Sequence, residues 1–210
     1  DVTDRWDKEA ATFDRDMGPM EFYMGMNWLR KSMTRQAHGH VLEAAVGTGR
    51  NIKYYKPVLC ESITMVDQSR KMVDVAYGKW KEYFPRAEDL AKVTFRHQSV
   101  IDDVKLPDPE GFDFVIQTMG LCSTPEPEAL IRSLARMTKK DGGRILLLEH
   151  GRSKYDWLNR VLDKTAAPHA DKHGCWWNKD IIKIVEDSGV DVVAISRYHL
   201  GTTYWIELKP

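Results

Sequence analysis

The chain has 210 residues with 31 basic and 31 acidic side chains, so its formal net charge is zero. This length favours a single domain over residues 1–210. Nucleic acids and anionic membranes bind through an excess of Lys and Arg, so the balanced charge disfavours both as general partners. Three cysteines without a CxxC pair do not indicate a disulfide framework. No apolar stretch reaches the roughly 18 residues that a membrane-spanning helix needs.

Residues 1–36 are expected to form helices ahead of the first strand. Apolar residues recur at helical spacing over 3–13 and again over 20–36. In the second stretch the residues of one face are Phe22, Met26, Leu29 and Met33. Asp4 and Pro19 are typical of helix starts, so we predict two helices here.

Strands and helices alternate from residue 41 onward. Buried-strand patterns lie at 41–45, 62–67, 92–98, 112–119 and 143–150. The predicted helices between them are a short one over 50–55, one from an N-cap at Ser69 to about residue 83, and one that Gly142 and Gly143 close. Such alternation indicates a parallel sheet covered on both faces.

The C-terminal part breaks this rhythm. Residues 178–189 form an amphipathic pattern, and the apolar runs 190–200 and 202–209 flank Gly201 as the strands of a hairpin. We therefore predict an α/β, Rossmann-like fold with a seven-stranded, mostly parallel sheet and a C-terminal antiparallel hairpin. Helices cover both faces, and residues 151–177 form a cap after the fifth strand.

The stretch "VLEAAVGTGRN", residues 41–51, suggests the ligand. In open α/β sheets, ligands bind beyond the carboxyl ends of the strands, which is where Gly47 and Gly49 fall. A dinucleotide loop would carry a third glycine where Ile52 stands, and the phosphate-binding motif GxxxxGK[ST] is absent. The pattern therefore favours a nucleoside without phosphates, such as S-adenosylmethionine.

Other residues at strand ends agree with this ligand. Asp67 closes the second strand, where an ionised carboxylate can accept both ribose hydroxyls. Glu43 precedes the loop and is expected near the ammonium of the methionine part. The remaining polar candidates are Gln98 and Ser99 beside the adenine, and Gln117 and Thr118 beside the methionine part and the methyl group. Each feature alone also fits a turn or a helix cap.

His150, after the fifth strand, is the candidate base for the acceptor, because imidazole transfers protons near neutral pH. A histidine hydrogen-bonded at a strand end is the alternative. His169, His173 and Cys175 have the spacing HxxxHxC, but no convincing fourth ligand accompanies them, so we predict no metal. Cys122 is expected to be a buried thiol.

Bulky apolar side chains surround the predicted acceptor side. They are Met17, Met20, Met24 and Met26 in the N-terminal segment, and Trp157, Trp176 and Trp177 in the cap. These residues either line an apolar acceptor site or pack in the core.

The sequence resembles the class I S-adenosylmethionine-dependent methyltransferases, of the methyltransf-11 and quinone-biosynthesis type. The segments that carry the likeness are "VLEAAVGTGRN", "ITMVDQSRKM", "FDFVIQTMGLCS" and "GGRILLLEHG". It covers about residues 20–151 and implies S-adenosylmethionine as cofactor, S-adenosylhomocysteine as product, and further cofactor contacts from Gln68, Met72 and Val100. The family usually has glycine where this chain has Ala45, whose methyl group would either crowd the methionine part or oppose a positive φ.

The likeness continues through "EHGRSKYDWLNRVLDKTAAPHADKHGCWWNKD", which is similar to a fungal mitochondrial inner-membrane group and to animal membrane-anchored thiol S-methyltransferases. The shared positions are Glu149-His150, Trp157, Val161-Leu162-Asp163, His169 and Gly174-Cys175. This resemblance implies a mitochondrial inner-membrane location through an anchor outside the given chain. Without such an anchor, a soluble intracellular protein is expected.

We therefore expect methyl transfer to a small, fairly apolar acceptor: a thiol, a quinone precursor or a lipid-like molecule. Two alternatives remain open. One is a non-catalytic protein that supports assembly or stability of a mitochondrial complex, which Ala45 motivates. The other is an RNA or protein methyltransferase, which the neutral charge disfavours.

Overall fold

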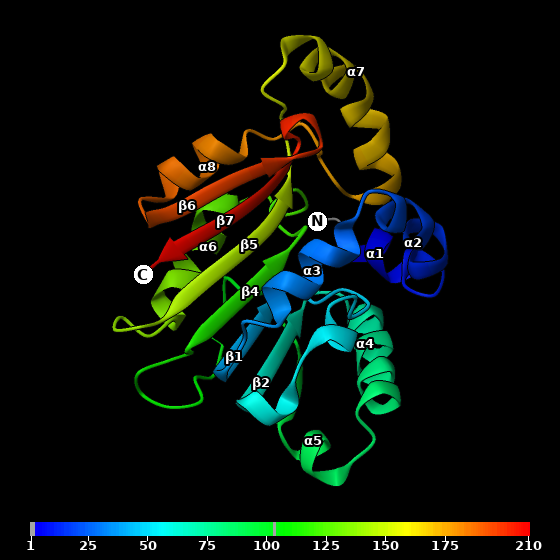
Figure 1. Cartoon of the computed structure of the whole chain (residues 1–210). Coiled ribbons are helices and arrows are strands. Elements are labelled where there is room, and N and C mark those ends of the chain that lie inside the picture. Colours follow the sequence, from blue (N-terminus) through cyan, green and yellow to red (C-terminus); the bar gives the residue numbers. More distant parts are fainter. Residues whose placement is uncertain (1–2, 103) are drawn as a thin grey trace.

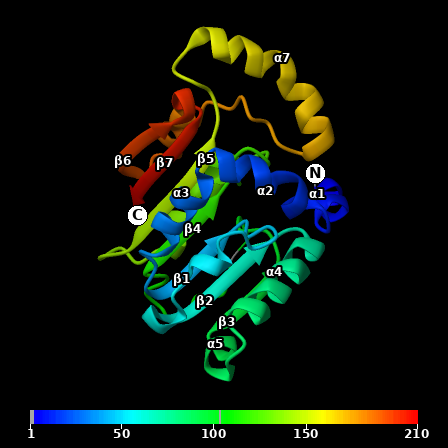
Figure 2. The same cartoon turned by 45° about the vertical axis from the view of Figure 1, so that its right-hand side comes forward.

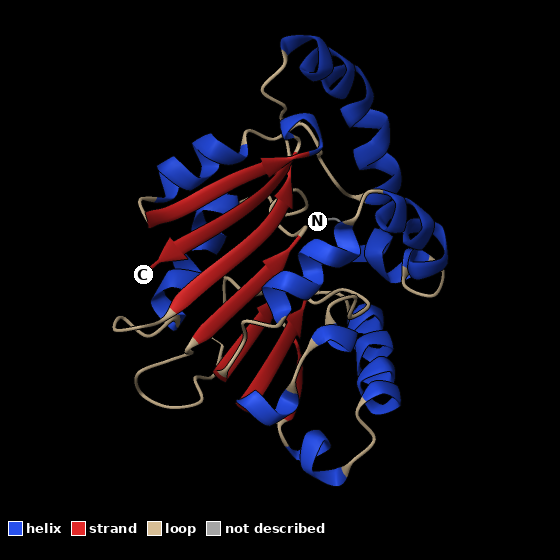
Figure 3. Ribbon diagram, in the orientation of Figure 1, coloured by secondary structure: helices blue, strands red, loops and turns tan. Residues whose placement is uncertain are grey.

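A seven-stranded sheet lies at the centre of the computed structural model, which describes residues 3–102 and 104–210 (Figures 1 and 3). The strand order is β3-β2-β1-β4-β5-β7-β6. The strands are β1 (Gly39–Ala44), β2 (Cys60–Asp67), β3 (Val93–His97), β4 (Phe114–Thr118), β5 (Arg144–His150), β6 (Asp191–Tyr198) and β7 (Thr203–Lys209). Strands β1 to β5 pair in parallel, and β7 is antiparallel to both β5 and β6. The predicted Rossmann-like sheet with a terminal hairpin is confirmed.

The helices are distributed over both faces and one end of the sheet. They are α1 (Thr3–Glu9), α2 (Phe13–Tyr23), α3 (Met26–Thr34), α4 (Arg70–Tyr83), α5 (Ala87–Ala91), α6 (Pro127–Met137), α7 (Asp156–His173) and α8 (Ile181–Ser188). Three 3-10 turns complete the set: η1 (Ile52–Tyr54), η2 (Pro57–Leu59) and η3 (His199–Gly201). Helices α3 and α4 pack on one face of the sheet, and α6 and α8 pack on the other.

Strand β5 shows why the sheet needs helices on both faces. Its side chains alternate, so Ile145 and Leu147 join the α6 and α8 side while Leu146 and Leu148 join the α3 and α4 side. All four are fully buried. Burying a side chain of this size contributes roughly 1.5–3 kcal/mol, so the strand ends rest on a well-packed core.

The N-terminal segment forms three helices, so the prediction of two was wrong. The second predicted helix is interrupted at Gly25, whose φ of +67° is accessible to glycine at little cost. As a result Phe22 lies on α2 and is 69% exposed, whereas Met26, Leu29 and Met33 of α3 are buried. Pro19 lies inside α2 instead of starting a helix.

Two other helix boundaries differ from the predicted ones. The predicted helix over 50–55 is only the 3-10 turn Ile52–Tyr54. Helix α6 ends at Met137, before Gly142, because Thr138 already has an extended backbone and begins the return to the sheet. The predicted N-cap is confirmed, since the Ser69 side chain accepts a hydrogen bond from the backbone N–H of Met72.

The predicted cap contains one long helix, α7, at the same end of the sheet as α1 and α2 (Figure 2). Arg5 of α1 donates to the carbonyl oxygen of Ala170 at 3.0 Å, and His173 contacts Glu9 at 2.8 Å. The first and the seventh helix are therefore joined above the strand ends. None of the helices in the described part of the chain is both long and apolar enough to cross a bilayer.

Candidate active site

A cavity of about 870 Å³ lies at the carboxyl ends of β1, β2, β4 and β5. The loops after these strands form its floor, and α1, α2 and α7 contribute its roof. Of the predicted site residues, nine line it: Ala45, Gly47, Asp67, Gln68, Met72, Ser99, Val100, Thr118 and His150. Glu43, Gly49, Gln98 and Gln117 are not among the lining residues. The sheet thus brings most of the predicted residues to one place.

The glycine loop turns sharply by using left-handed backbone angles. The φ values of Ala45, Gly47 and Gly49 are +52°, +55° and +77°. A Cβ atom on Gly49 would lie 2.3 Å from Ile52 Cδ1 and 3.1 Å from Ala76 Cβ, so this position requires glycine for space as well as for φ. Ala45 does adopt the positive φ, at a strain of roughly 1–2 kcal/mol.

Asp67 links the first two loops of the site. One carboxylate oxygen accepts from the Gly47 N–H and the other from the Ser69 N–H, each at 2.8 Å. Burial raises the pKa of Asp67 above its usual value, although these hydrogen bonds favour the ionised form. Each oxygen has a second lone pair, so the carboxylate can still accept from two hydroxyl groups in the cavity.

Of the two residues expected beside the adenine, Ser99 lines the cavity and Gln98 does not. Gln68 donates to Ser99 Oγ at 3.0 Å, and both residues line the cavity together with Met72 and Val100. Gln98 lies one residue earlier, just after the end of β3, and is not among the residues that line the cavity.

Glu43 is buried beneath the loop instead of facing the cavity. Its carboxylate accepts hydrogen bonds from Asn51 Nδ2 at 2.9 Å and from the Tyr55 hydroxyl at 2.6 Å. Burial raises the pKa of Glu43 to about 7, despite these hydrogen bonds. Glu43 was expected near the ammonium of the methionine part, but the structure places its side chain outside the cavity, in contact with residues 51 and 55.

Gln117 is also buried away from the cavity. Its Nε2 atom donates to Glu149 Oε1 at 3.2 Å, and Glu149 also accepts from the backbone N–H groups of Gly120 and Leu121. Burial raises the pKa of Glu149 to about 8. These contacts hold residues 119–122, the turn that follows β4 at the cavity floor.

Sequence reasoning missed two arginines that face the cavity, Arg30 and Arg50. Arg30 is 4% exposed and makes a two-pronged ion pair with Glu21, at 2.9 and 3.0 Å. It also donates to Asn51 Oδ1 and to Thr118 Oγ1, each at 3.0 Å. Its spacing from Met26 and Met33 places it on the buried face of α3, and this was the signal that could have found it.

Arg50 carries a free donor. Its Nη2 atom lies 3.0 Å from Glu21, whereas Nη1 has no hydrogen-bond partner among the described residues and is 3.9 Å from Asp14. A buried guanidinium donor without a partner costs free energy. A carboxylate bound in the cavity beside Arg50 would satisfy it.

Cys122, His150 and Cys175 meet at the acceptor side of the same cavity. His150 Nε2 lies 2.9 Å from Cys175 Sγ, and the three ligand-type atoms all lie within 4.8 Å of one another. The proximity of Cys175 lowers the pKa of Cys122 well below its usual value, against the effect of burial. Burial alone would lower the pKa of His150, but negative charge at Cys122 raises it.

The predicted apolar residues of the acceptor side do not all reach the cavity. Met17, Met20, Met24, Met26 and Trp177 line it. Trp157 and Trp176 do not, and they are 53% and 44% exposed. His169 stacks on Trp177 with ring centroids 3.8 Å apart and does not join Cys175, so the grouping HxxxHxC is not assembled as a ligand set.

Known methyltransferases are similar to this chain in sequence and in fold. A family model described as "Methyltransferase domain" matches residues 24–195. The chain belongs to this methyltransferase family. It is 33% identical over 218 residues to the mitochondrial methyltransferase OMS1 of Saccharomyces cerevisiae, and the match takes in 100% of this chain and 46% of the yeast protein. The chain therefore spans about half the length of that relative.

Two further matches extend the comparison. Phosphatidylethanolamine N-methyltransferase of Cereibacter sphaeroides is 31% identical over 157 residues, covering 74% of this chain and 71% of the relative. The solved complex of DhpI with S-adenosylhomocysteine superposes with a TM-score of 0.67 at 19% identity, over 99% of this chain and 94% of that one. The resemblance to methyltransferases is confirmed, and the chain shares its fold with S-adenosylmethionine-dependent methyltransferases.

The residues of the cavity fit this cofactor. S-adenosylmethionine has a ribose with two hydroxyls, an adenine and an amino acid end with a carboxylate. Asp67 offers acceptors for hydroxyls, and the unpartnered Arg50 Nη1 offers a donor for a carboxylate. Within the loop after β1, residues 45–51, Arg50 is the one basic residue.

Proposed function

We propose that the enzyme methylates a small, fairly apolar acceptor such as a thiol, a quinone precursor or a lipid-like molecule. The observation that carries this proposal is the composition of the cavity opposite Asp67. Four methionines of the N-terminal segment line it, and the cap adds Leu158, Leu162 and Trp177. An apolar acceptor is stabilised by leaving water for such a surface, whereas a charged one is not.

We propose the following roles toward the cofactor. Asp67 accepts the ribose hydroxyls, and Met72 and Val100 pack on the adenine between Gln68 and Ser99. Arg50 and Thr118 contact the methionine part. When bound, the cofactor supplies an electrophilic methyl group. The chain's own contribution is to align the acceptor with it, and positioning of this kind can account for roughly 7–11 kcal/mol of a barrier.

His150 is proposed to receive the proton that a thiol or hydroxyl acceptor must lose. His150 is the last residue of β5, and its ring lies at the cavity wall next to the sulfur atoms of Cys122 and Cys175. A base within hydrogen-bond reach of the acceptor typically contributes 10²–10⁴-fold to the rate. The apolar surroundings keep competing water away from this step.

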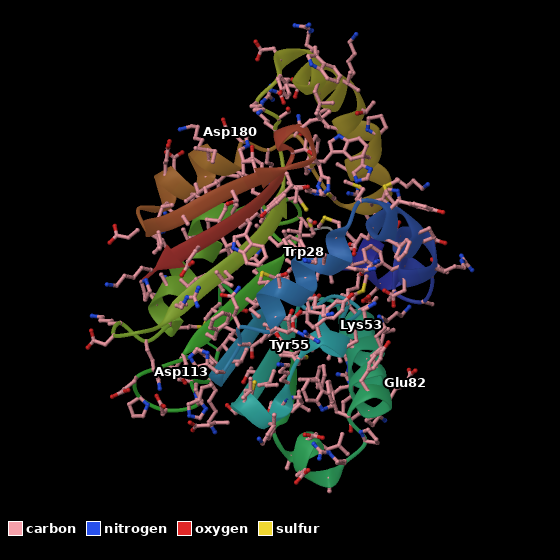
Figure 4. The ribbon with its side chains drawn as sticks, in the orientation of Figure 1. Trp28, Lys53, Tyr55, Glu82, Asp113 and Asp180 are labelled. Atoms are coloured by element: carbon pink, nitrogen blue, oxygen red, sulfur yellow. The ribbon has the colours of Figure 1, made fainter. Side chains whose placement is uncertain are left out.

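A membrane-derived acceptor is supported by the surface beside the cavity. Phe22, Tyr23 and Trp28 of α2 and α3 are 69%, 87% and 63% exposed, and the side chain of Trp28 is labelled in Figure 4. The name of the Cereibacter relative gives a phospholipid as its acceptor. On the similarity to the mitochondrial yeast relative, we also propose a mitochondrial location, with membrane association through a segment outside this chain.

The experiment that tests the acceptor class is a screen of methyl transfer to thiols, quinols and lipids with labelled S-adenosylmethionine. The Trp177→Ala variant should raise the KM for the acceptor and leave cofactor affinity unchanged. The matched control is Trp157→Ala, because Trp157 does not line the cavity.

Transfer to RNA or protein instead of any apolar acceptor would contradict the proposal. A cellular role that survives the Asp67→Ala substitution would favour the non-catalytic role instead. Imaging of the tagged full-length protein tests the location, and exclusion from mitochondria would overturn that part.

A further inference from the structure

We propose that Cys122, His150 and Cys175 form a zinc site whose fourth coordination position opens into the acceptor side of the cavity. The three ligand atoms lie within 4.8 Å of one another, although Cys122 follows β4, His150 ends β5 and Cys175 follows α7. Zinc binding does not depend on the proposed acceptor, but the use of the open position rests on the proposed function.

The chemistry of the three ligands matches zinc. Two thiolates and one neutral imidazole are a known combination for zinc sites that keep one position open, whereas a closed structural site has four protein ligands. Zn–S bonds of about 2.3 Å and Zn–N bonds of about 2.0–2.1 Å place tetrahedral ligand atoms roughly 3.5–3.8 Å apart. The His150 to Cys175 separation of 2.9 Å is shorter, and the ion would widen it by less than about 1 Å.

Surrounding groups hold the three ligands in place. The backbone N–H of Trp176 donates to the carbonyl oxygen of Cys122 at 3.1 Å, which ties the segment after α7 to the turn after β4. Ser123 Oγ lies 3.5 Å from Cys122 Sγ and can donate to a thiolate there. Hydrogen bonds of this kind orient metal ligands and tune the metal.

Lys179 supports an anionic cluster at this position. Its Nζ atom donates to the carbonyl oxygens of Leu121 and Thr124, at 2.9 and 2.6 Å, and so places a positive charge beside Cys122. Two thiolates and one Zn²⁺ balance in charge. The cluster would then gain a negative charge only when an anionic ligand enters the fourth position.

The fourth position faces the apolar cap. All three ligand residues line the cavity, as do Leu158, Leu162 and Trp177. The segment that follows α7 runs back across the strand ends, so the ion would also fasten the cap to the sheet (Figure 2). A ligand that fits is a thiol with an apolar body, whose sulfur binds zinc as a thiolate and releases its proton to water. With zinc bound, His150 is a ligand of the metal and does not take this proton, so the metal replaces it as the group that activates a thiol acceptor.

This assignment revises the expectation of no metal. The sequence pattern joined Cys175 to His169 and His173, which are close in the chain. The structure instead joins Cys175 to His150, which is 25 residues away, and to Cys122 after another strand. Ligands from three separate segments leave no spacing motif.

The test is the zinc content of the reduced, full chain after incubation with zinc and removal of the excess, measured by elemental analysis. We expect one zinc per chain in the wild type. Cys122→Ser and Cys175→Ser should each bind zinc at least about tenfold more weakly. The matched control Cys60→Ser should bind like the wild type, because Cys60 is buried elsewhere, beside the carbonyl oxygens of Ala37 and Lys56. Magnesium, which prefers oxygen ligands, should not compete.

Cobalt in place of zinc tests the open position without an activity measurement. The wild type should show the visible bands of tetrahedral cobalt and a sulfur-to-cobalt charge-transfer band, and added 2-mercaptoethanol should change both. Circular dichroism identifies a variant that fails to fold, and Cys122→Ala then serves as the second test of that position.

Three results would overturn the proposal. They are a wild type without zinc, equal zinc in the Cys122→Ser variant, and a Cys122–Cys175 disulfide as the form that persists in the presence of reductant and zinc. A cobalt spectrum that does not respond to thiol would overturn the open position. Calorimetric titration of the zinc-free protein with S-adenosylmethionine tests the proposed function separately, because Asp67 and Arg50 are outside the cluster. Cofactor binding without zinc binding would overturn the zinc site alone, and zinc binding without cofactor binding would overturn the proposed function alone.

Discussion

The cofactor side and the acceptor side of the cavity are built on different principles. The cofactor side consists of the loops after β1, β2 and β3, and neighbouring segments of the sheet hold it through backbone hydrogen bonds, such as the one from the Val46 N–H to the Val66 carbonyl oxygen. The acceptor side consists of α1 to α3, α7, residues 119–124 and residues 174–177. Long-range side-chain contacts hold it, for example Arg30 to Thr118 and His173 to Glu9. Local sequence therefore encodes the first side, and tertiary contacts create the second.

The largest expected effect comes from Arg30, which stabilises the acceptor side. The Arg30→Met substitution removes the two-pronged ion pair with Glu21 and leaves that carboxylate with Arg50 as its ion-pair partner among the described residues. We expect a loss of about 3 kcal/mol in the free energy of unfolding. Urea unfolding measures it. The control is Arg15→Met on the exposed surface of α2, and equal losses in the two variants would show that Arg30 does not hold the helices.

Asp67 tests the cofactor side. The Asp67→Asn substitution keeps the size of the side chain but replaces one acceptor oxygen by a donor, so it cannot serve both backbone N–H groups and both ribose hydroxyls. We expect affinity for S-adenosylhomocysteine to fall about 10- to 100-fold, the equivalent of 1.5–3 kcal/mol. Isothermal titration calorimetry measures this. Asp74→Asn, an exposed carboxylate on α4, should bind like the wild type, and unchanged affinity in Asp67→Asn would refute its role.

Glu43 gives the cofactor side a pH dependence. Its pKa is about 7 in the folded chain, whereas the ordinary pKa of a glutamate, 4.5, applies in the unfolded chain. Between these two pH values the folded state therefore keeps a proton that the unfolded chain releases. The free energy of unfolding should therefore fall by up to about 3 kcal/mol as the pH rises from 4.5 to 7, and level off above 7.

The Glu43→Gln variant should lack this component, because an amide does not titrate. Its oxygen can still accept from Asn51. Denaturant unfolding at several pH values, with Glu61→Gln on the exposed end of β2 as control, measures the difference. Parallel pH curves for Glu43→Gln and the wild type would contradict a raised pKa at Glu43.

The smallest expected effect is at Ala45, in the sharp turn that follows β1. Ala45→Gly relieves a φ of +52° but adds freedom to the unfolded chain, so we expect a net gain of up to about 1 kcal/mol in the free energy of unfolding. Ala44→Gly, one residue earlier in β1, should instead lose about 0.5–1 kcal/mol because it lies in a regular strand. Thermal unfolding compares them, and the same sign for both variants would show that Ala45 is unstrained.

The sequence predicted the sheet because its evidence is local. The apolar run around Leu146 and the glycines after β1 are visible without any knowledge of contacts, and so is Asp67 at a strand end. The residues of α3 were expected to be helical as part of a longer helix over 20–36, but Arg30 was not recognised because one charged residue on an apolar face is normally solvated. Its partners, Glu21, Asn51 and Thr118, become neighbours only when α2, the loop after β1 and β4 meet.

The acceptor side was harder to predict from the sequence than the cofactor side. The methionines were identified as candidate lining, but the sequence could not distinguish Trp177, which lines the cavity, from Trp157 and Trp176, which do not. The direction of a side chain on a long helix or on the turn after it depends on what the helix packs against. Cys122 was expected to be an ordinary buried thiol, and only the meeting of β4, β5 and the segment after α7 places it beside His150.

A crystal structure of the complex with S-adenosylhomocysteine tests the central claim most directly. The account predicts both ribose hydroxyls on the Asp67 carboxylate, the adenine between Gln68 and Ser99, and the amino acid carboxylate beside Arg50. The ligand's sulfur should face His150. An Asp67 side chain that makes no contact with the ribose, or a ligand seated outside the cavity above β1 and β2, would contradict the account.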